Sequence, residues 1–401
     1  MKVVVSSALS TSDAGNEALL RKLLELLWQR RFSVEAITDD PVGQARRFSG
    51  LTLHQTPGSA RGAPAVLRGP LARWRLFVAR RAARLPLLAR LLPSPQARAV
   101  AALRCADLII ACPGSYLANA GGAIDVHLAQ LAIAARAKAP LVLAPMSIRA
   151  PDEPSRLRAL TRALRGARQV FVRDAESELF CRDLGIAASL SNDISFLDDG
   201  FSAAAAGGTV QPAYVAVTVV SPPAGATAGT PARDAAQRHY LDAMVAAIGA
   251  IAGHARLPVK LIVQSDGDRQ IARQLANGLA VPTDIVDVTN APARLQATLV
   301  SSYCLIASRF DSAIAALAAG CPVAVMTRTA SQRSVLDLYG LDDLGVPIET
   351  IDPEALAGLM IRWGDDRTGF RQRCASLRDS LRRVGDPFID CLASVTVPPE
   401  G

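Results

Sequence analysis

The chain has 401 residues, of which half are hydrophobic and 20% are charged, so it is long enough for two domains and too apolar to be disordered. Its formal net charge is +8, but this excess is local. The segment between Asp40 and Asp107 contains twelve arginines and no acidic residue, which leaves a formal charge of −4 for the rest of the chain. The charge therefore argues against a uniformly basic nucleic-acid-binding protein and indicates one anion-facing segment.

The seven cysteines are scattered, odd in number and without a CxxC pair, which favours neither a disulfide framework nor a zinc site. Four of them lie in or beside apolar runs and are expected to be buried thiols: Cys105, Cys112, Cys304 and Cys321. No run reaches the roughly 18 apolar residues of a membrane span. We expect a cytoplasmic protein without a metal site.

Short apolar runs alternate with amphipathic segments in the first half of the chain. Strands are expected at residues 3–6, 33–37, 106–111, 140–145 and 169–172. Helices are expected at residues 17–30, 123–137 and 156–164, and a loop at 113–122. This alternation is typical of a mostly parallel sheet covered by helices on both faces.

A second alternating set follows a stretch rich in Ala and Gly at 198–212, which predicts a linker there. Strands are expected at 214–220, 259–263, 283–288, 304–307 and 322–326. Helices are expected at 240–252, 268–275, 291–300 and 311–319, with terminal helices from residue 353. The pattern predicts an α/β protein with two Rossmann-like domains facing a cleft, residues 1–197 and 213–401.

Several common signatures are missing from the sequence, namely GxGxxG after a strand, GxxxxGK[ST], GxSxG and HExxH. Their absence argues against a dinucleotide oxidoreductase, a P-loop ATPase and an α/β-hydrolase. The chain has four histidines, and none follows a clear strand. A triad centred on histidine is therefore not expected.

The loops that follow strands are the candidate site, because open α/β sheets bind ligands at the carboxyl ends of their strands. In the first such loop Asp13, Asn16 and Glu17 could orient a sugar hydroxyl, or could belong to an ordinary helix start with Asp13 as its cap. The second loop contains Gly114 and Ser115, and its alternative interpretation is a plain turn.

Arg173 follows the expected strand at 169–172, next to a helix start. A guanidinium group there can bind two oxygens of a phosphate or carboxylate. The alternative is a surface ion pair with Asp174 or Glu176.

Ser308 and Arg309 follow the expected strand at 304–307 and precede an apolar helix. Arg309 is expected to project toward the ligand. Asp311 either caps this helix or faces the same ligand.

These four loops, in this order, resemble the polysaccharide pyruvyl transferase family over most of residues 1–326. The matching positions are Gly15 to Ala18, Ala106 to Ile110, Ser147 to Pro151, Val172 to Asp174 with Ser177, Leu184, Gly185, Asp193 and Phe196, and Ser308-Arg309 with Ile314, Ala316, Gly320, Pro322 and Val323. The resemblance implies a fold like that of the two-domain GT-B glycosyltransferases. It also implies transfer of a pyruvyl group from phosphoenolpyruvate to a sugar of an exopolysaccharide or cell-surface glycan, without a cofactor.

Site residues follow from the resemblance in three groups. Those expected at the donor are Arg173, Arg309, Ser308, Gly114 and Ser115, and those expected at the acceptor are Asp13, Asn16 and Glu17. Arg309 and Asp311 are the expected catalytic residues. The sequence departs from the family at Asp311, where the family has histidine, and at Pro113, where a glycine is replaced.

The departures leave three interpretations open. With a raised pKa, the Asp311 carboxyl could protonate the methylene carbon of the donor or accept the acceptor's proton. The protein could instead be a GT-B glycosyltransferase in which Arg309 meets the diphosphate of a nucleotide sugar. It could also be a family member that has lost catalysis.

The Arg-rich insertion covers about residues 60–104 of the first domain. Between 66 and 92, leucines, valines, Trp74 and Phe77 are interspersed with arginines, and three prolines divide the segment into short helices. Residues 60–95 could lie on an anionic membrane at its inner face, near a lipid-linked acceptor. Alternatively, the short helices pack their leucines on the domain. Two aromatic residues are too few for a nucleic-acid stacking platform.

Overall fold

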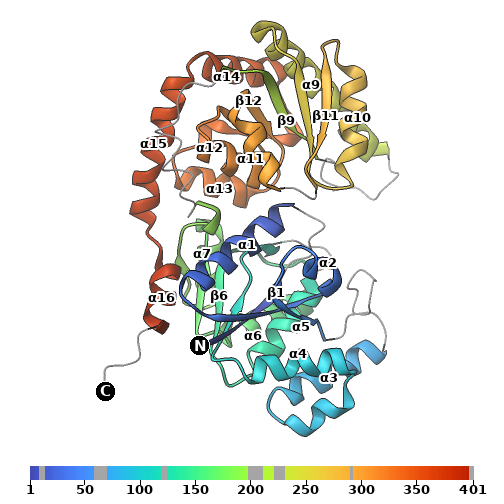
Figure 1. The fold of residues 1–401 in the computed structure, drawn as a ribbon, viewed down its shortest axis with the longest axis vertical. Helices are drawn as coiled ribbons and strands as arrows, with labels where there is room; N and C mark the ends of the chain where they lie inside the picture. The colour runs from blue at the N-terminus through green and yellow to red at the C-terminus, as the bar shows by residue number, and fades with distance from the viewer. Residues whose placement is uncertain are drawn as a thin grey trace. The chain divides into compact units, whose positions relative to one another are not determined.

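The computed structural model describes residues 1–8, 14–57, 70–118, 124–196, 211–220, 231–289 and 292–396. The chain divides into two compact units, and Figure 1 shows helices and a sheet in each of them. Unit 1 comprises Met1–Thr11, Leu19–Ile194 and Val384–Gly401, and unit 2 comprises Ser12–Ala18 and Ser195–Arg383. The first residues of helix α1 are therefore assigned to unit 2, and the rest of that helix to unit 1. Most of the expected linker at 198–212 lies outside the described residues, and the cleft between the domains stays a prediction.

Unit 1 is built on a parallel sheet in the order β3-β2-β1-β4-β6-β7-β8, with β5 paired to β6. Its strands are β1 (Lys2–Ala8), β2 (Ser33–Thr38), β3 (Thr52–Gln55), β4 (Leu108–Ala111), β5 (Gly114–Leu117), β6 (Leu141–Ile148), β7 (Gln169–Val172) and β8 (Ser189–Leu190). Its helices are α1 (Ala14–Gln29), α2 (Pro41–Ala45), α3 (Pro70–Ala82), η1 (Pro86–Leu91), α4 (Ser94–Arg104), α5 (Ile124–Ala134), α6 (Pro154–Arg165), α7 (Ala175–Asp183), η2 (Ile194–Phe196) and α16 (Pro387–Thr396), of which η2 spans the boundary to unit 2.

All five strands expected in the first half are present, because each is a run of apolar residues that the sheet buries. The expected loop at 113–122 is wrong in part, since β5 begins at Gly114 and pairs with Met146 of β6. Gly114 has φ +149°, a backbone conformation that favours glycine, so the residue that suggested a turn starts a strand instead. Strands β3 and β8 were also not expected, because they are short and partly polar.

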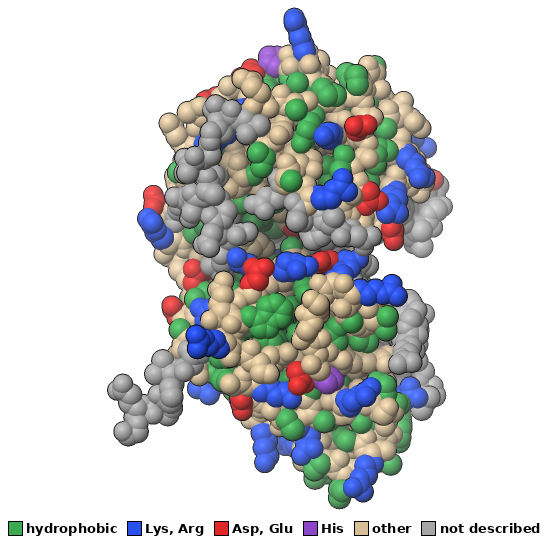
Figure 2. Space-filling view, in the orientation of Figure 1, with side chains coloured by type: hydrophobic (Ala, Val, Ile, Leu, Met, Phe, Trp, Pro, Cys, Tyr) green, Lys and Arg blue, Asp and Glu red, His purple; other side chains and the backbone are tan. Residues whose placement is uncertain are grey.

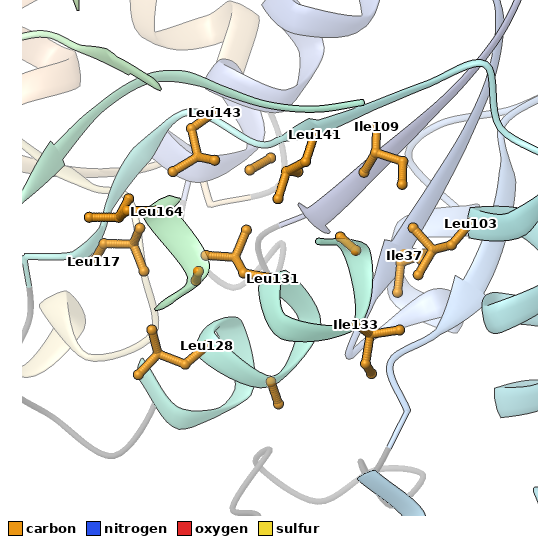
Figure 3. Packing of buried hydrophobic residues seen from close by; sticks show 14 of the residues in the cluster. Ile37, Leu103, Ile109, Leu117, Leu128, Leu131, Ile133, Leu141, Leu143 and Leu164 are labelled. Carbon is orange, nitrogen blue, oxygen red and sulfur yellow. The ribbon is translucent and has the colours of Figure 1, made fainter. Parts of the chain in front are cut away.

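The hydrophobic core of unit 1 lies between its sheet and the helices α4, α5 and α6 (Figure 3). Leu131 of α5 lies next to Leu141 and Leu143 of β6, whereas Ile133 of the same helix lies beside Ile37 and Leu103. Full burial of one such side chain is worth roughly 1.5–3 kcal/mol, so this layer holds the strand ends of the unit in place.

The last helix of the chain, α16, packs on unit 1, although we expected residues 213–401 to form the second domain. Phe388 of α16 is fully buried, and its ring meets Phe171 of β7 edge-on at 5.5 Å between centroids. Beside this contact the Asn192 amide donates to Asp386 Oδ1 at 2.9 Å. The amphipathic pattern of this helix would allow it to pack on either unit. In the structure it packs on unit 1, where Phe388 contacts Phe171.

Unit 2 is built on a parallel sheet in the order β11-β10-β9-β12-β13-β14. Its strands are β9 (Tyr214–Thr218), β10 (Val259–Val263), β11 (Thr283–Asp287), β12 (Ser302–Ala307), β13 (Val323–Thr327) and β14 (Gly345–Pro347). Its helices are α9 (Pro231–Ala255), α10 (Asp268–Gly278), α11 (Pro292–Val300), α12 (Phe310–Ala318), α13 (Ala330–Leu338), η3 (Asp342–Leu344), η4 (Ile348–Thr350), α14 (Pro353–Asp365) and α15 (Arg367–Val384), whose last residue is assigned to unit 1.

The seven cysteines are all free thiols. Cys112, Cys304 and Cys321 are buried as expected, whereas Cys105 is exposed at the end of α4, so that expectation is wrong. Within the described residues, none of the helices has the length and hydropathy needed to cross a membrane.

We expect Gly364→Ala to destabilise unit 2. Alanine normally favours a helix interior over glycine by about 1 kcal/mol. A Cβ at Gly364 in α14, however, would overlap the ring of Tyr303, which is fixed by a 2.6 Å hydrogen bond to Asp365. We predict a loss of about 1–3 kcal/mol in the free energy of unfolding, measured by urea denaturation. Gly358→Ala in the same helix is the control, because its Cβ would meet nothing within 4 Å, and it should be neutral or stabilising. Equal effects of the two substitutions would contradict this explanation.

Candidate functional site

Four parallel strands of unit 2 end at the same edge of the sheet, and polar side chains follow each of them. Thr218 ends β9, and its hydroxyl accepts the Ser308 N–H at 3.0 Å, directly after β12. The Ser308 hydroxyl lies 3.3 Å from the hydroxyl of Tyr240, a fully buried side chain of α9. Ser308 thus has a structural role at the sheet edge, where its hydroxyl and backbone are already engaged.

Arg309 is the N-cap residue of α12, and its guanidinium group is held by a buried carboxylate. Asp268, only 3% exposed in its side chain, lies 3.1 Å from the Arg309 guanidinium. The Asp268 carboxylate also accepts the backbone N–H of Ser265 at 2.9 Å, and the Ser265 hydroxyl accepts from Arg309 at 2.8 Å. A single aspartate at the start of α10 therefore orients the arginine that follows β12.

Asp311 lies in the first turn of α12, but the capping position belongs to Arg309. Its Oδ2 accepts the side-chain amide of Gln264, the residue after β10, at 2.9 Å. The same amide group uses its oxygen to accept the Ser312 hydroxyl at 2.6 Å. Asp311 is thereby positioned across the sheet edge as a half-buried carboxylate near Arg309.

Arg328 is a second arginine of this edge, and it was not among the expected site residues. It follows β13, the strand that pairs with β12. Burial lowers the pKa of Arg328, and the positive charge of Arg309 lowers it further, so the two guanidinium groups lie within electrostatic reach of one another. The positional rule that selected Arg309, an arginine immediately after a strand, could also have found Arg328.

In unit 1, Arg173 follows β7 and is held in the same manner. Its guanidinium donates to Asp193 Oδ2 at 2.6 Å and to the Ser147 hydroxyl at 3.0 Å. The alternative of a surface ion pair is wrong, because Asp174 caps α7 by accepting the Ser177 N–H at 2.9 Å, and Glu176 pairs with Arg149. Arg173 is thus a fixed, mostly buried cation at a strand end.

The other residues expected at the donor or the acceptor are Gly114, Ser115, Glu17, Asp13 and Asn16. Gly114 and Ser115 lie in β5, where Ser115 is exposed, so the turn expected there is absent, and their place at the donor stays a prediction. Glu17 is buried in the first turn of α1. Asp13 and the side chain of Asn16 lie outside the described residues. Whether the unit 1 residues and the unit 2 residues serve one ligand stays a prediction.

Among the residues that the structure describes, no group of three or more His, Cys, Asp or Glu side chains could hold a metal ion. Burial lowers the pKa of His127, which stacks beside Tyr116 with 4.3 Å between ring centroids, to about 4. The His127 ring is therefore neutral at pH 7, as expected for a core histidine.

Solved structures similar to the whole chain share its two-sheet architecture. The UDP-GlcNAc 2-epimerase of Methanocaldococcus jannaschii has 10% identity and a TM-score of 0.56, over 90% of this chain and 93% of that chain. The Phytolacca americana UGT2 complexed with UDP-2-fluoro-glucose and pterostilbene has 13% identity and a TM-score of 0.55, over 98% and 99%. The spinosyn forosaminyltransferase SpnP has 14% identity and a TM-score of 0.53, over 99% of both chains.

These similarities show the fold, and the chain is a two-domain protein of the GT-B class with a Rossmann-like architecture in each domain. A model of the family described as polysaccharide pyruvyl transferase matches residues 14–329, most of the chain. The protein belongs to the polysaccharide pyruvyl transferase family and is a transferase. A comparison with curated proteins finds no match.

We predict that Asp193→Ala destabilises unit 1 by about 3–5 kcal/mol, because it leaves the Arg173 guanidinium buried without its carboxylate. Urea denaturation measures this loss. The matched control is Glu178→Ala, which removes one partner of the exposed Arg182–Glu178 pair on α7, 3.9 Å apart, and should change stability by less than about 0.5 kcal/mol. If Asp193→Ala lowers the free energy of unfolding by less than about 1 kcal/mol, water or another group stabilises the charge of Arg173 in its place.

Proposed function

We propose that this transferase moves a pyruvyl group from phosphoenolpyruvate to a sugar of an exopolysaccharide or another cell-surface glycan, with a glycan or lipid-linked sugar as acceptor. Membership of the family supports pyruvyl transfer in polysaccharide biosynthesis. The observation that carries the choice of donor is the pair of arginines, Arg309 and Arg328, after two adjacent strands of unit 2.

Phosphoenolpyruvate carries a carboxylate on C1 and a phosphate on the oxygen of C2, so two anionic groups lie close together. Two neighbouring guanidinium groups match this charge, and each can bind two oxygens. Burial is the main cause of the lowered pKa of Arg328, and the positive charge of Arg309 lowers it further, so both effects disfavour the charged guanidinium group. A bound ligand with two anionic groups would offset both costs, which favours an anionic ligand over a neutral one.

In this proposal Arg309, which Asp268 holds in place, contributes one positive charge to the donor site, and Arg328 provides the second. Arg173 is proposed to bind the same donor from unit 1, as the family resemblance implies. Since Asp193 and Ser147 fix its side chain, Arg173 would bind without first losing rotamer freedom.

The proposed reaction consists of an addition at C2 followed by a substitution at C2. One sugar hydroxyl attacks C2 while C3 takes up a proton and becomes a methyl group. A second hydroxyl of the same sugar then attacks C2, the bond from C2 to the phosphate oxygen breaks, and a cyclic ketal and inorganic phosphate result. One hydroxyl proton balances the proton taken up at C3, and the other leaves with phosphate. Asp311 is the proposed group that passes these protons.

We expect Arg328→Ala to weaken phosphoenolpyruvate binding by 10- to 100-fold, because a charge-assisted contact is worth about 1.5–3 kcal/mol. Calorimetric titration measures the affinity, and thermal unfolding without the donor checks the fold. Arg333→Ala on α13, where the side chain is exposed, is the matched control and should leave the affinity unchanged. Unchanged affinity in Arg328→Ala would remove Arg328 from the donor site.

The charge at position 311 provides a separate prediction. Asp311→His, which restores the family residue, should preserve or raise the affinity for phosphoenolpyruvate, since it removes a negative charge beside Arg309. Asp311→Asn should do the same and lower the rate of phosphate release if the carboxyl transfers protons. Asp337→Asn on the exposed side of α13 is the control. A weaker donor affinity in both Asp311 variants, with folding intact, would contradict this role.

A GT-B glycosyltransferase activity is the second candidate. It is favoured by the position of Arg309 at the N-terminus of α12, where a helix end and a guanidinium group also suit a diphosphate. The titration with phosphoenolpyruvate should therefore be repeated with UDP. Tighter binding of UDP, lost in Arg328→Ala, would replace the pyruvyl donor by a nucleotide sugar. Binding of neither ligand would favour a family member without catalysis.

A further inference from the structure

Exposed apolar side chains gather in α3 and the short helix η1. Five of the twelve large hydrophobic side chains that are exposed in the described residues lie within this one segment. They are Trp74 (45% exposed), Phe77 (54%), Leu85 (57%), Leu87 (70%) and Leu91 (54%). Single exposed hydrophobic residues are ordinary, whereas a group of this kind on one structural element indicates an interaction surface.

Helix α3 has two apolar faces, and only one of them packs on unit 1. Leu76, Ala79 and Ala83 are buried and hold the helix on the core, so the expected packing of short helices on the domain is present. Trp74 and Phe77 are three residues apart and lie on the opposite, exposed face. The exposed apolar face therefore belongs to a helix whose other face already packs on unit 1.

The surface is basic as well as apolar. The guanidinium carbon of Arg81 lies 4.6 Å from the centre of the Phe77 ring, and Arg84 and Arg90 are exposed beside the leucines. Burial lowers the pKa of Arg80, and the charges of Arg136 and Arg162 lower it further. Since no acidic residue occurs between Asp40 and Asp107, this segment offers these arginines no counter-charge of its own.

Figure 2 shows basic and hydrophobic side chains intermixed at the lower end of the view, where α3 and α4 lie in Figure 1. An aromatic and leucine face with arginines at its margin is the pattern of helices that lie in a membrane interface. Pro86 is the first residue of η1, and Pro93, the N-cap residue of α4, follows two residues after the end of η1.

We propose that α3 and η1 form a docking surface for a lipid bilayer that contains anionic lipids. Trp74, Phe77 and the exposed leucines enter the boundary between head groups and acyl chains, and the arginines bind lipid phosphates. Charge complementarity selects this partner, because the segment has an excess of positive charge and an apolar face on the same helices. The proposal is independent of which donor the transferase uses.

Flotation of the full chain with lipid vesicles tests the proposal. Vesicles of phosphatidylcholine with phosphatidylglycerol should retain the protein at low salt at least tenfold better than vesicles of phosphatidylcholine alone. Retention should fall severalfold in 0.5 M NaCl, because salt screens the arginines. The double variant Trp74→Ser with Phe77→Ser should lose at least tenfold in retention, and Arg81→Gln with Arg84→Gln should lose the preference for anionic vesicles.

Matched controls on α7 are Leu179→Ser, which removes another exposed leucine, and Arg182→Gln, which removes another exposed arginine. Both should float like the parent protein. Quenching of tryptophan fluorescence by brominated lipids, in a Trp28→Phe background, gives a readout that does not depend on variants in the surface. Trp363 also remains in that background, but it is buried in unit 2, so the quenched part of the signal comes from Trp74. Equal flotation of surface and control variants, or no quenching, would overturn the proposal. If the protein forms a dimer without vesicles and Phe77→Ser dissociates that dimer, the surface serves self-association and the membrane proposal is overturned.

Discussion

At the ends of two buried parallel strands, a carboxylate at the same sheet edge neutralises a guanidinium group and holds it in position. Both units contain this arrangement. Arg173 is paired with Asp193 and Ser147, and Arg309 is paired with Asp268 and Ser265. A buried ion pair adds little net stability compared with apolar residues of the same volume. The two pairs are therefore better understood as devices that orient an arginine than as sources of stability.

The orientation of these arginines depends in turn on the parallel sheets. Gln264 and Ser265 follow β10, Ser308 follows β12 and Arg328 follows β13. These residues gather because the three strands end at one edge of the sheet. Asp311 is connected to this edge through the amide of Gln264. The carboxylate at this position is therefore held by a side chain from a neighbouring strand, which fixes its place at the sheet edge.

Much of the fold was predictable, because buried parallel strands are runs of apolar residues with recognisable ends. The bounds of β7 and β10 match the expected ones, whereas β5 was missed because its proline and glycine suggested a turn. Arg173 and Arg309 were found by their place after a strand, but their partners Asp193 and Asp268 are distant in sequence. Only the folded chain brings such residues together. Arg328 was missed although it satisfies the same positional rule, since no family motif drew attention to it.

The return of α16 to unit 1 affects how the protein is made. Unit 1 is interrupted by unit 2, so a ribosome produces most of unit 1, then residues 195–383 of unit 2, and only then the helix that covers Phe171. Domains generally begin to fold as they emerge during synthesis. The core of unit 1 therefore stays open at β7 until α16 has been translated. A polypeptide that stops before Phe388 would leave this aromatic face exposed to quality control.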